Sequence, residues 1–325
     1  MKVIWVHTFN PHVKNSGIFM HEFLKSFKSE NDIDVELFYL GSLKNIPELF
    51  NNIYNLYTRR KEYDIIHCQY GSFCSLACMF LPVKKIVTLR GSDLFQLPVG
   101  TIKEKLHSKL AGFFTKVSLN SFNKIIVMSK QMKQMLPLKY ASKTVVITDP
   151  IDMDKFTEND KQYSRERFFP DFKKSDILIL FTSISRKNPI KRFEMAESVV
   201  RRLNELDTTL TYRLVSANNF SNDDMKYVFS AVDICLLTSV YEGWPNCIKE
   251  SLACNTSFVS TNVSDLKDIA IKTNSCFVCD DNIEHLAEKI FVSLRQPKEE
   301  LRKYIEFLSV DNIKIELMKV YQHTC

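Results

Sequence analysis

The segment of this chain that is richest in residues able to do chemistry lies in its second half, where two glutamates flank the start of a predicted helix. Glu242 and Glu250 are separated by seven residues in the segment EGWPNCIKE. An apolar strand ends near Ser239, so Glu242 falls in a loop, whereas Glu250 falls on a helix that has Pro245 in its first turn. The pattern predicts that both carboxylates face one crevice, and that the free N–H groups at the helix start attract an anion such as a diphosphate. Asn255 follows that helix, and we expect it to adopt the left-handed conformation that ends it.

The elements that must position these residues form a repeating strand–helix pattern. Short apolar runs predict strands at 2–7, 35–40, 64–69, 85–90, 124–129 and 144–148, and then at 177–183, 211–216, 233–239, 257–261 and 276–279. The spans between them predict helices, among them 17–28, 189–205, 245–254 and a closing group from about 282. Continuous apolar strands separated by helices indicate parallel sheets covered on both faces.

We therefore predict an α/β fold of two Rossmann-like domains that face each other across a cleft. The expected domains are 1–150 and 151–325, with the last helix packing back on the first domain. The polar, proline-containing stretch 149–176 is predicted to link them.

Composition excludes several classes of protein. The 325 residues include 44 Lys and Arg and 38 Asp and Glu, and the excess of basic residues lies in the first 150 positions. No secretory signal or membrane-spanning run is visible, and nine cysteines then indicate reduced thiols in a cytoplasmic protein. No G-x-G-x-x-G follows a strand, which argues against a nicotinamide dehydrogenase. The lone pair Cys276 and Cys279 has no partner pair at metal-site spacing.

The motif E-G-W-P-N-x-x-K-E-S-x-A-C-N-x-x-x-V-S-T at 242–261 resembles the signature of the retaining glycosyltransferases of family 4, which have the GT-B fold. The pair Pro189-x-Lys191 before a helix is similar to the start of the second domain in the same family, and weaker similarities occur at LRGSD (89–93) and VMSK (127–130).

The resemblance implies a role for each matching residue. Glu250 would hold the ribose hydroxyls of a nucleotide-sugar, and Glu242 would contact the transferred sugar. Lys191 would neutralise the diphosphate. Arg186 matches the second basic position only approximately, and Lys187 and Arg192 are also available there.

The remaining matches concern the backbone around the donor. Gly17 would either bring its backbone beside the diphosphate or begin a helix, and Trp244 would either pack under its loop or line the donor pocket. The other motif residues expected against the sugar and phosphates are Gly243, Pro245 and Asn246.

Two positions depart from the family pattern. Arg90 precedes Gly91 where the family usually has His–Gly, and Asp149–Pro150 replaces the usual Asn–Gly. An arginine does not act as a base at neutral pH, so Arg90 would act on the reaction through its charge or would pair with Asp93.

The stretch 103–143 contains nine lysines and one acid, with Leu106, Leu110, Phe113, Phe114 and Val117 at helical spacing. One interpretation is a helix that packs its apolar face on the sheet and leaves the lysines in water. The other is a cationic amphipathic helix that lies on an anionic membrane surface, on the inner leaflet, to reach a lipid-linked acceptor. Nothing resembling a nucleic-acid-binding fold accompanies the charge.

Together these features predict a metal-independent retaining glycosyltransferase of the hexosyltransferase type that needs no cofactor. It would move a sugar from a nucleoside diphosphate donor to a hydroxyl of a glycan or glycolipid, in the synthesis of a cell-surface polysaccharide. Two alternatives remain open: a non-catalytic GT-B protein that binds a glycan or a partner, and a sugar-nucleotide epimerase.

Overall fold

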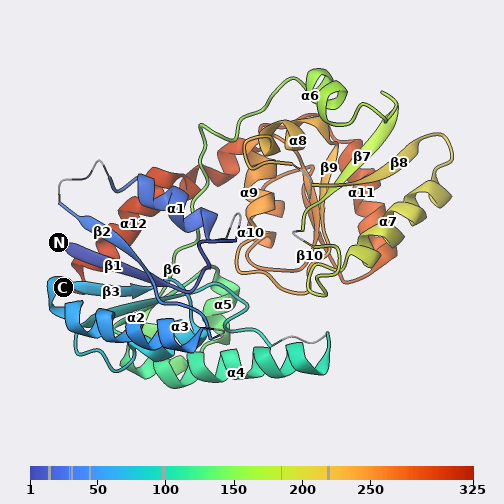
Figure 1. Cartoon of the computed structure of the whole chain (residues 1–325). Coiled ribbons are helices and arrows are strands. Elements are labelled where there is room, and N and C mark those ends of the chain that lie inside the picture. Colours follow the sequence, from blue (N-terminus) through green and yellow to red (C-terminus); the bar gives the residue numbers. More distant parts are fainter. Residues whose placement is uncertain are drawn as a thin grey trace. The chain divides into compact units, whose positions relative to one another are not determined.

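The computed structural model describes residues 1–13, 16–28, 30, 32–43, 45–96, 100–183, 185–217 and 220–325. It divides into two compact units, Met1–Pro150 with Val310–Cys325, and Ile151–Ser309. Each unit contains one parallel sheet with helices packed around it (Figure 1). The predicted α/β class with two Rossmann-like sheets is confirmed.

The sheet of the first unit has six strands in the order β2-β1-β3-β4-β5-β6. Every residue of β1 except Lys2 is buried, as is all of β3, because helices cover both faces of the sheet. The strands are β1 (Lys2–His7), β2 (Asp34–Tyr39), β3 (Ile65–Cys68), β4 (Lys84–Leu89), β5 (Lys124–Val127) and β6 (Thr144–Val146). The helices are α1 (Ile18–Lys25), α2 (Ile46–Arg59), α3 (Ser72–Cys78), α4 (Ile102–Ser118), α5 (Lys130–Met135) and α12 (Val310–Gln322).

The last helix, α12, belongs to the first unit although it follows the second in sequence. Figure 1 shows it, in red, beside the blue strands of that unit. The hydroxyl of Tyr321 accepts a hydrogen bond from Trp5 Nε1 at 2.7 Å and lies 2.7 Å from Nδ1 of His67. All three side chains are buried, and burial lowers the pKa of His67 to about 3, so its ring is neutral. This network fastens the end of the chain to β1 and β3.

The sheet of the second unit has five parallel strands in the order β11-β10-β9-β7-β8. Its apolar core lies where α7 and α11 pack on the sheet, around Val199, Leu236 and Leu286. The strands are β7 (Asp176–Phe181), β8 (Thr211–Ser216), β9 (Ile234–Leu237), β10 (Phe258–Thr261) and β11 (Phe277–Cys279). The helices are α6 (Lys161–Phe168), α7 (Phe193–Leu206), α8 (Met225–Ala231), α9 (Asn246–Ala253), α10 (Lys267–Ala270) and α11 (Ile283–Leu294). Within the described ranges, no helix combines the length and the apolarity that crossing a bilayer requires.

The prediction that residues 149–176 form a linker is wrong for most of this stretch. It contains α6, which packs against α8. Lys161 and Arg165 of α6 both form ion pairs with Asp233, the first at 2.6 Å. The polar composition of this stretch therefore reflects charged groups that bind α6 to its own unit.

Helix boundaries also differ from expectation. Helix α7 begins at Phe193 and not at residue 189, because Arg192 adopts a left-handed conformation with φ of 53°. Pro245 lies at the N-cap of α9, just before the first turn. The expectation for Asn255 is confirmed, since its φ is 56° directly after α9.

We predict that Tyr321→Phe lowers the stability of the first unit by about 1–3 kcal/mol, because it leaves the buried Trp5 N–H without an acceptor. The measurement is urea unfolding followed by tryptophan fluorescence. The matched control is Tyr54→Phe at a side chain that is 65% exposed. Equal unfolding midpoints for the two variants would contradict the role of the network.

Candidate functional site

The predicted cation and the predicted acid meet at the carboxyl edge of the second sheet. Nζ of Lys191 lies 2.6 Å from Oε1 of Glu242, and Oγ of Ser239 donates to the same oxygen at 2.6 Å. Lys191 comes from the segment between β7 and α7, and Glu242 from the loop after β9. In open α/β sheets ligands bind at this edge. Both side chains keep a small exposed fraction, 22% for Lys191 and 15% for Glu242, so a ligand can reach them.

The surroundings of Lys191 favour its charged form. Burial by itself lowers the pKa of Lys191, but the negative charge of Glu242 raises it, as do Cys247, the hydrogen bond with Glu242 and Cys235. The pKa of Lys191 therefore lies above its ordinary value. The site offers an ammonium group that stays protonated next to a carboxylate, which is the cation that a diphosphate requires.

Arg192 fastens the two loops that carry the pair. Its Nε donates to the carbonyl oxygen of Thr238 at 2.6 Å, and its Nη1 forms an ion pair with Asp281 at 2.6 Å. In return, Oγ1 of Thr238 donates to the carbonyl oxygen of Lys191 at 2.7 Å. From the sequence, Arg192 is expected only as a substitute for Arg186. Its position next to Lys191 indicates that it lies near the site, but the sequence does not reveal that its side chain binds the backbone.

Arg186 is exposed, and its guanidinium carbon lies 4.8 Å from the ring centroid of Phe193. None of the contacts described for it involves Lys191 or Glu242. Its predicted contact with the diphosphate stays a prediction.

The motif residues after Glu242 form the turn into α9. Gly243 and Pro245 are buried, whereas Asn246 is exposed at the first position of the helix. Oγ of Ser264 donates to the carbonyl oxygen of Gly243 at 2.7 Å and holds the turn in place.

Trp244 is half-buried, and its ring centroid lies 5.4 Å from Nζ of Lys249. Lys249 itself is fully buried, which sequence analysis missed because a lysine on a short helix normally faces water. The buried ammonium therefore lies against the Trp244 ring.

Glu250 lies on α9 beyond its first turn and is partly exposed. Burial raises the pKa of Glu250 to about 7, although Lys249 and Lys155 act in the opposite direction. Near neutral pH this carboxyl group therefore exchanges between its protonated and ionised forms. A ligand that donates hydrogen bonds to it would favour the carboxylate.

In the first unit, Gly17 caps the amino end of α1 with a φ of 71°. A Cβ atom at this position would lie 3.0 Å from Cβ of Phe9, so both the conformation and the space require glycine. The expected helix start is confirmed, and the approach of this backbone to a diphosphate stays a prediction.

Arg90 forms an ion pair with Asp149 and not with Asp93. Its Nη1 lies 2.5 Å from both carboxylate oxygens of Asp149, and its Nε donates to the carbonyl oxygen of Gln69 at 2.8 Å. Its guanidinium carbon also lies 4.0 Å from the ring centroid of Phe19. Asp93 instead accepts from the backbone N–H of Arg90. The two positions that depart from the family pattern thus contact each other.

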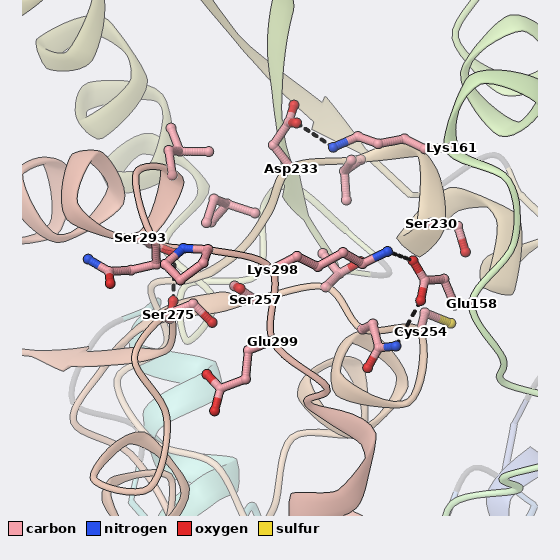
Figure 2. A pocket seen from close by; sticks show the side chains of 17 residues that line it. Glu158, Lys161, Ser230, Asp233, Cys254, Ser257, Ser275, Ser293, Lys298 and Glu299 are labelled. Atoms are coloured by element: carbon pink, nitrogen blue, oxygen red, sulfur yellow. Dashed lines mark hydrogen bonds and ion pairs between the residues drawn. The ribbon is translucent and has the colours of Figure 1, made fainter.

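A cavity of about 290 Å³ lies at the opposite edge of the second sheet, where β9, β10 and β11 begin (Figure 2). Ion pairs line it, Lys161 with Asp233 and Lys298 with Glu158, and Figure 2 shows both. None of Lys191, Glu242 and Glu250 lines this cavity, so it is separate from the residues that the sequence motif predicts. Across the described ranges, no three His, Cys, Asp or Glu side chains gather in a way that would hold a metal ion.

Residues 190–296 match a family model described as "Glycosyl transferases group 1". No curated protein sequence matches the chain significantly. The matched segment contains Lys191, Glu242 and Glu250, which are the residues on which the prediction was based.

Solved structures resemble nearly the whole chain. Sucrose-phosphate synthase from Thermosynechococcus elongatus is 14% identical with a TM-score of 0.74, and the alignment covers 99% of each chain. Anabaena HepE in complex with UDP-glucose is 13% identical with a TM-score of 0.71, covering 99% of this chain and 100% of the other. A glycosyltransferase from Rickettsia africae is 17% identical with a TM-score of 0.67, covering 99% and 98%. At these identities the likeness shows the fold. The chain therefore has the GT-B fold and, over residues 190–296, is similar to the group 1 glycosyltransferases, as the sequence motif predicted.

Proposed function

We propose that this protein is a retaining glycosyltransferase of the hexosyltransferase type that uses a nucleoside diphosphate sugar as its donor. The observation that carries the proposal is the ion pair between Lys191 and Glu242 at the carboxyl edge of the second sheet. In this pair, an ammonium group and a carboxylate lie side by side within the segment that matches the glycosyltransferase family.

Each member of the pair has a distinct task. The ammonium of Lys191 binds the diphosphate, whose negative charge grows as the bond to the sugar breaks, so this cation lowers the barrier. The carboxylate of Glu242 accepts hydrogen bonds from hydroxyls of the sugar and orients it. This account needs no metal ion and no cofactor, because the protein's own cations neutralise the leaving group.

The start of α9 holds the remainder of the donor. Glu250 accepts hydrogen bonds from the ribose hydroxyls, and the turn at Gly243, Trp244 and Asn246 lies along the sugar and phosphates. Because HepE was solved with UDP-glucose, uracil nucleotides are the first donors to test. Arg186 and the backbone at Gly17 contribute further contacts to the diphosphate.

The first unit binds the acceptor, a hydroxyl of a glycan or a glycolipid. Arg90 is held by Asp149 and Gln69, so it positions groups and supplies positive charge, and it does not exchange a proton. The setting that we propose is the cytoplasmic face of a membrane on which a cell-surface polysaccharide is assembled. The two alternative functions are those of a non-catalytic glycan-binding protein and of an epimerase. The following experiments distinguish both from a glycosyltransferase.

We predict that Glu242→Gln and Glu250→Gln have different effects. Glu242→Gln lowers kcat for sugar transfer by about a hundredfold or more but leaves the affinity for UDP nearly unchanged, because UDP lacks the transferred sugar that Glu242 contacts. Glu250→Gln weakens UDP binding. The measurements are calorimetric titration with UDP and release of UDP from UDP-sugars.

The matched control is Glu197→Gln, an exposed position on α7 of the same unit. Donor binding without transfer or hydrolysis in the wild type would instead indicate a binding protein. Conversion of the donor sugar with no acceptor present would indicate an epimerase.

We predict that Lys191→Met reduces the preference of the protein for UDP over UMP by about tenfold or more, because the lost ammonium serves the second phosphate. The measurement is a pair of titrations with UDP and UMP. Arg201→Met on the exposed side of α7 is the control. An unchanged ratio in Lys191→Met would show that this residue does not bind the diphosphate.

We predict that UDP binds about tenfold more tightly at pH 8 than at pH 6, because the ribose hydroxyls require the ionised form of Glu250. Burial raises the pKa of this carboxyl group to about 7, so the unliganded site is mostly protonated at pH 6 and mostly ionised at pH 8. Titrations over this range should show the change in the wild type and a smaller change in Glu250→Gln. An equal pH dependence in both would contradict the assignment.

A further inference from the structure

Helix α4 packs on the first unit with its small residues and turns its large apolar residues outward. Its buried positions are Ser108, Ala111, Gly112, Thr115 and Ser118. On the opposite side, Ile102 is 88% exposed and Phe113 is 59% exposed. Leu106, Leu110 and Val117 complete this outer row, and each is more than 40% exposed. Their spacing of three and four residues places all five on one stripe of the helix, which spans about 22 Å. We call these five residues the α4 stripe.

Specific contacts fix this orientation of α4. Oγ1 of Thr115 donates to the carbonyl oxygen of Asp93 at 2.8 Å, and Oγ of Ser118 donates to Oγ of Ser75 at 2.8 Å. A Cβ atom at Gly71 would lie only 2.7 Å from Oγ1 of Thr115, so α3 and α4 approach closely at this point. Turning the α4 stripe inward would break these hydrogen bonds and force bulky side chains into that close contact. Packing of the apolar face on the sheet, one of the two interpretations of the sequence, is therefore wrong.

Lysines border the α4 stripe on both sides. On a helical projection, Lys105, Lys109 and Lys116 lie along one side and Lys103 along the other. The helix contains one acid, Glu104, which is bound to Thr101 in the capping box at the amino end. The outer surface of α4 thus combines apolar side chains with positive charge, in a unit whose sequence has 22 basic and 13 acidic residues.

This combination fits one kind of partner best. A bilayer with anionic headgroups accepts apolar side chains between its lipids and attracts the flanking lysines. A second copy of the chain fits less well, because pairing two α4 stripes would bring lysines of both copies together with few acids to balance them. Nucleic acid would leave the apolar row facing phosphates and water.

We propose that the α4 stripe and its flanking lysines dock the first unit on an anionic lipid bilayer. The helix lies in the plane of the surface, with Ile102, Leu106 and Phe113 inserted among the lipids. The docking itself is independent of catalysis, but its purpose, which is to reach a lipid-linked acceptor, rests on the proposed function. Helix α2 also exposes Ile46, Phe50, Tyr54 and Tyr57, but it has no lysine, so we assign the attraction to α4.

The test is co-sedimentation of the whole protein with vesicles of phosphatidylcholine alone or with about one third phosphatidylglycerol. We expect at least about tenfold stronger binding to the anionic vesicles, and a steep loss of this binding at high salt. The variant Leu106→Ser/Phe113→Ser should lose binding to anionic vesicles, as should Lys109→Gln/Lys116→Gln. All four side chains are exposed, so both variants should unfold at the same temperature as the wild type.

The matched controls lie in the second unit, and both should bind as the wild type does. Leu206→Ser/Phe307→Ser removes two apolar side chains that are 49% and 56% exposed, and Lys267→Gln/Lys272→Gln removes two exposed charges. Equal binding to both kinds of vesicle would overturn the proposal. Binding of the α4 variants to anionic vesicles at the wild-type level would also overturn it. The same holds if only Phe50→Ser/Tyr54→Ser, on α2, loses this binding.

Two further measurements separate the possible failures. The first is analytical ultracentrifugation of the wild type and of Leu106→Ser/Phe113→Ser. If the wild type is a dimer and the variant is a monomer, the α4 stripe binds a second copy of the chain and not a bilayer. Titration with UDP in the absence of lipid tests the proposed function by itself, and the α4 variants should bind UDP as the wild type does. UDP binding without vesicle binding would reject docking alone, whereas vesicle binding without UDP binding would reject the donor site alone.

Discussion

The ion pair between Lys191 and Glu242 is the interaction on which the interpretation of this protein depends. Two opposite charges that lose part of their hydration are stable only when their geometry is good and further hydrogen bonds satisfy them. Here Ser239 supplies one such bond, and Arg192 fixes the loops from which both charges come. The parallel sheet makes this possible, because β7 and β9 are neighbours and their carboxyl ends release both loops at the same edge. In the proposed function, a bound diphosphate is a second anion for Lys191 beside Glu242.

A second ion pair links two departures from the family pattern. Arg90 and Asp149 lie 59 positions apart, and each differs from the residue usual in the family. Considered separately, each weakens the resemblance. In the structure the carboxylate of Asp149 forms an ion pair with the guanidinium of Arg90, so each of the two changes gives the other a partner. The loops after β4 and β6 are thereby joined at the carboxyl edge of the first sheet, at the position where the family has a histidine.

Helix α4 shows how packing at short range controls an exposed surface. Its contact with α3 involves a glycine, serines and a threonine, which allow a close approach and supply hydrogen bonds. Large side chains do not fit in that contact, so they must face the solvent together with the lysines. The exposed apolar row is a consequence of how the helix is held in its unit.

The amino-acid pattern alone is enough to predict the strand–helix alternation, the α/β class and the choice of Lys191 and Glu242 as site residues. The roles of Glu242, Glu250 and Lys191 are implied by the resemblance of their two motifs to those of a known family. The strand–helix alternation depends on local patterns, because apolar runs predict buried strands. The left-handed Asn255 was predictable for the same reason, since few residues tolerate that conformation. Only the tertiary structure decided which charges meet. That Arg192 binds backbone, that Lys249 is buried and that Arg90 pairs with Asp149 all depend on strand order and loop approach. The helix within 149–176 and the outward face of α4 were hidden for a related reason. The composition of a segment is the same whether its side chains face a neighbouring element or water. Only the packing of that segment in the fold distinguishes these two cases.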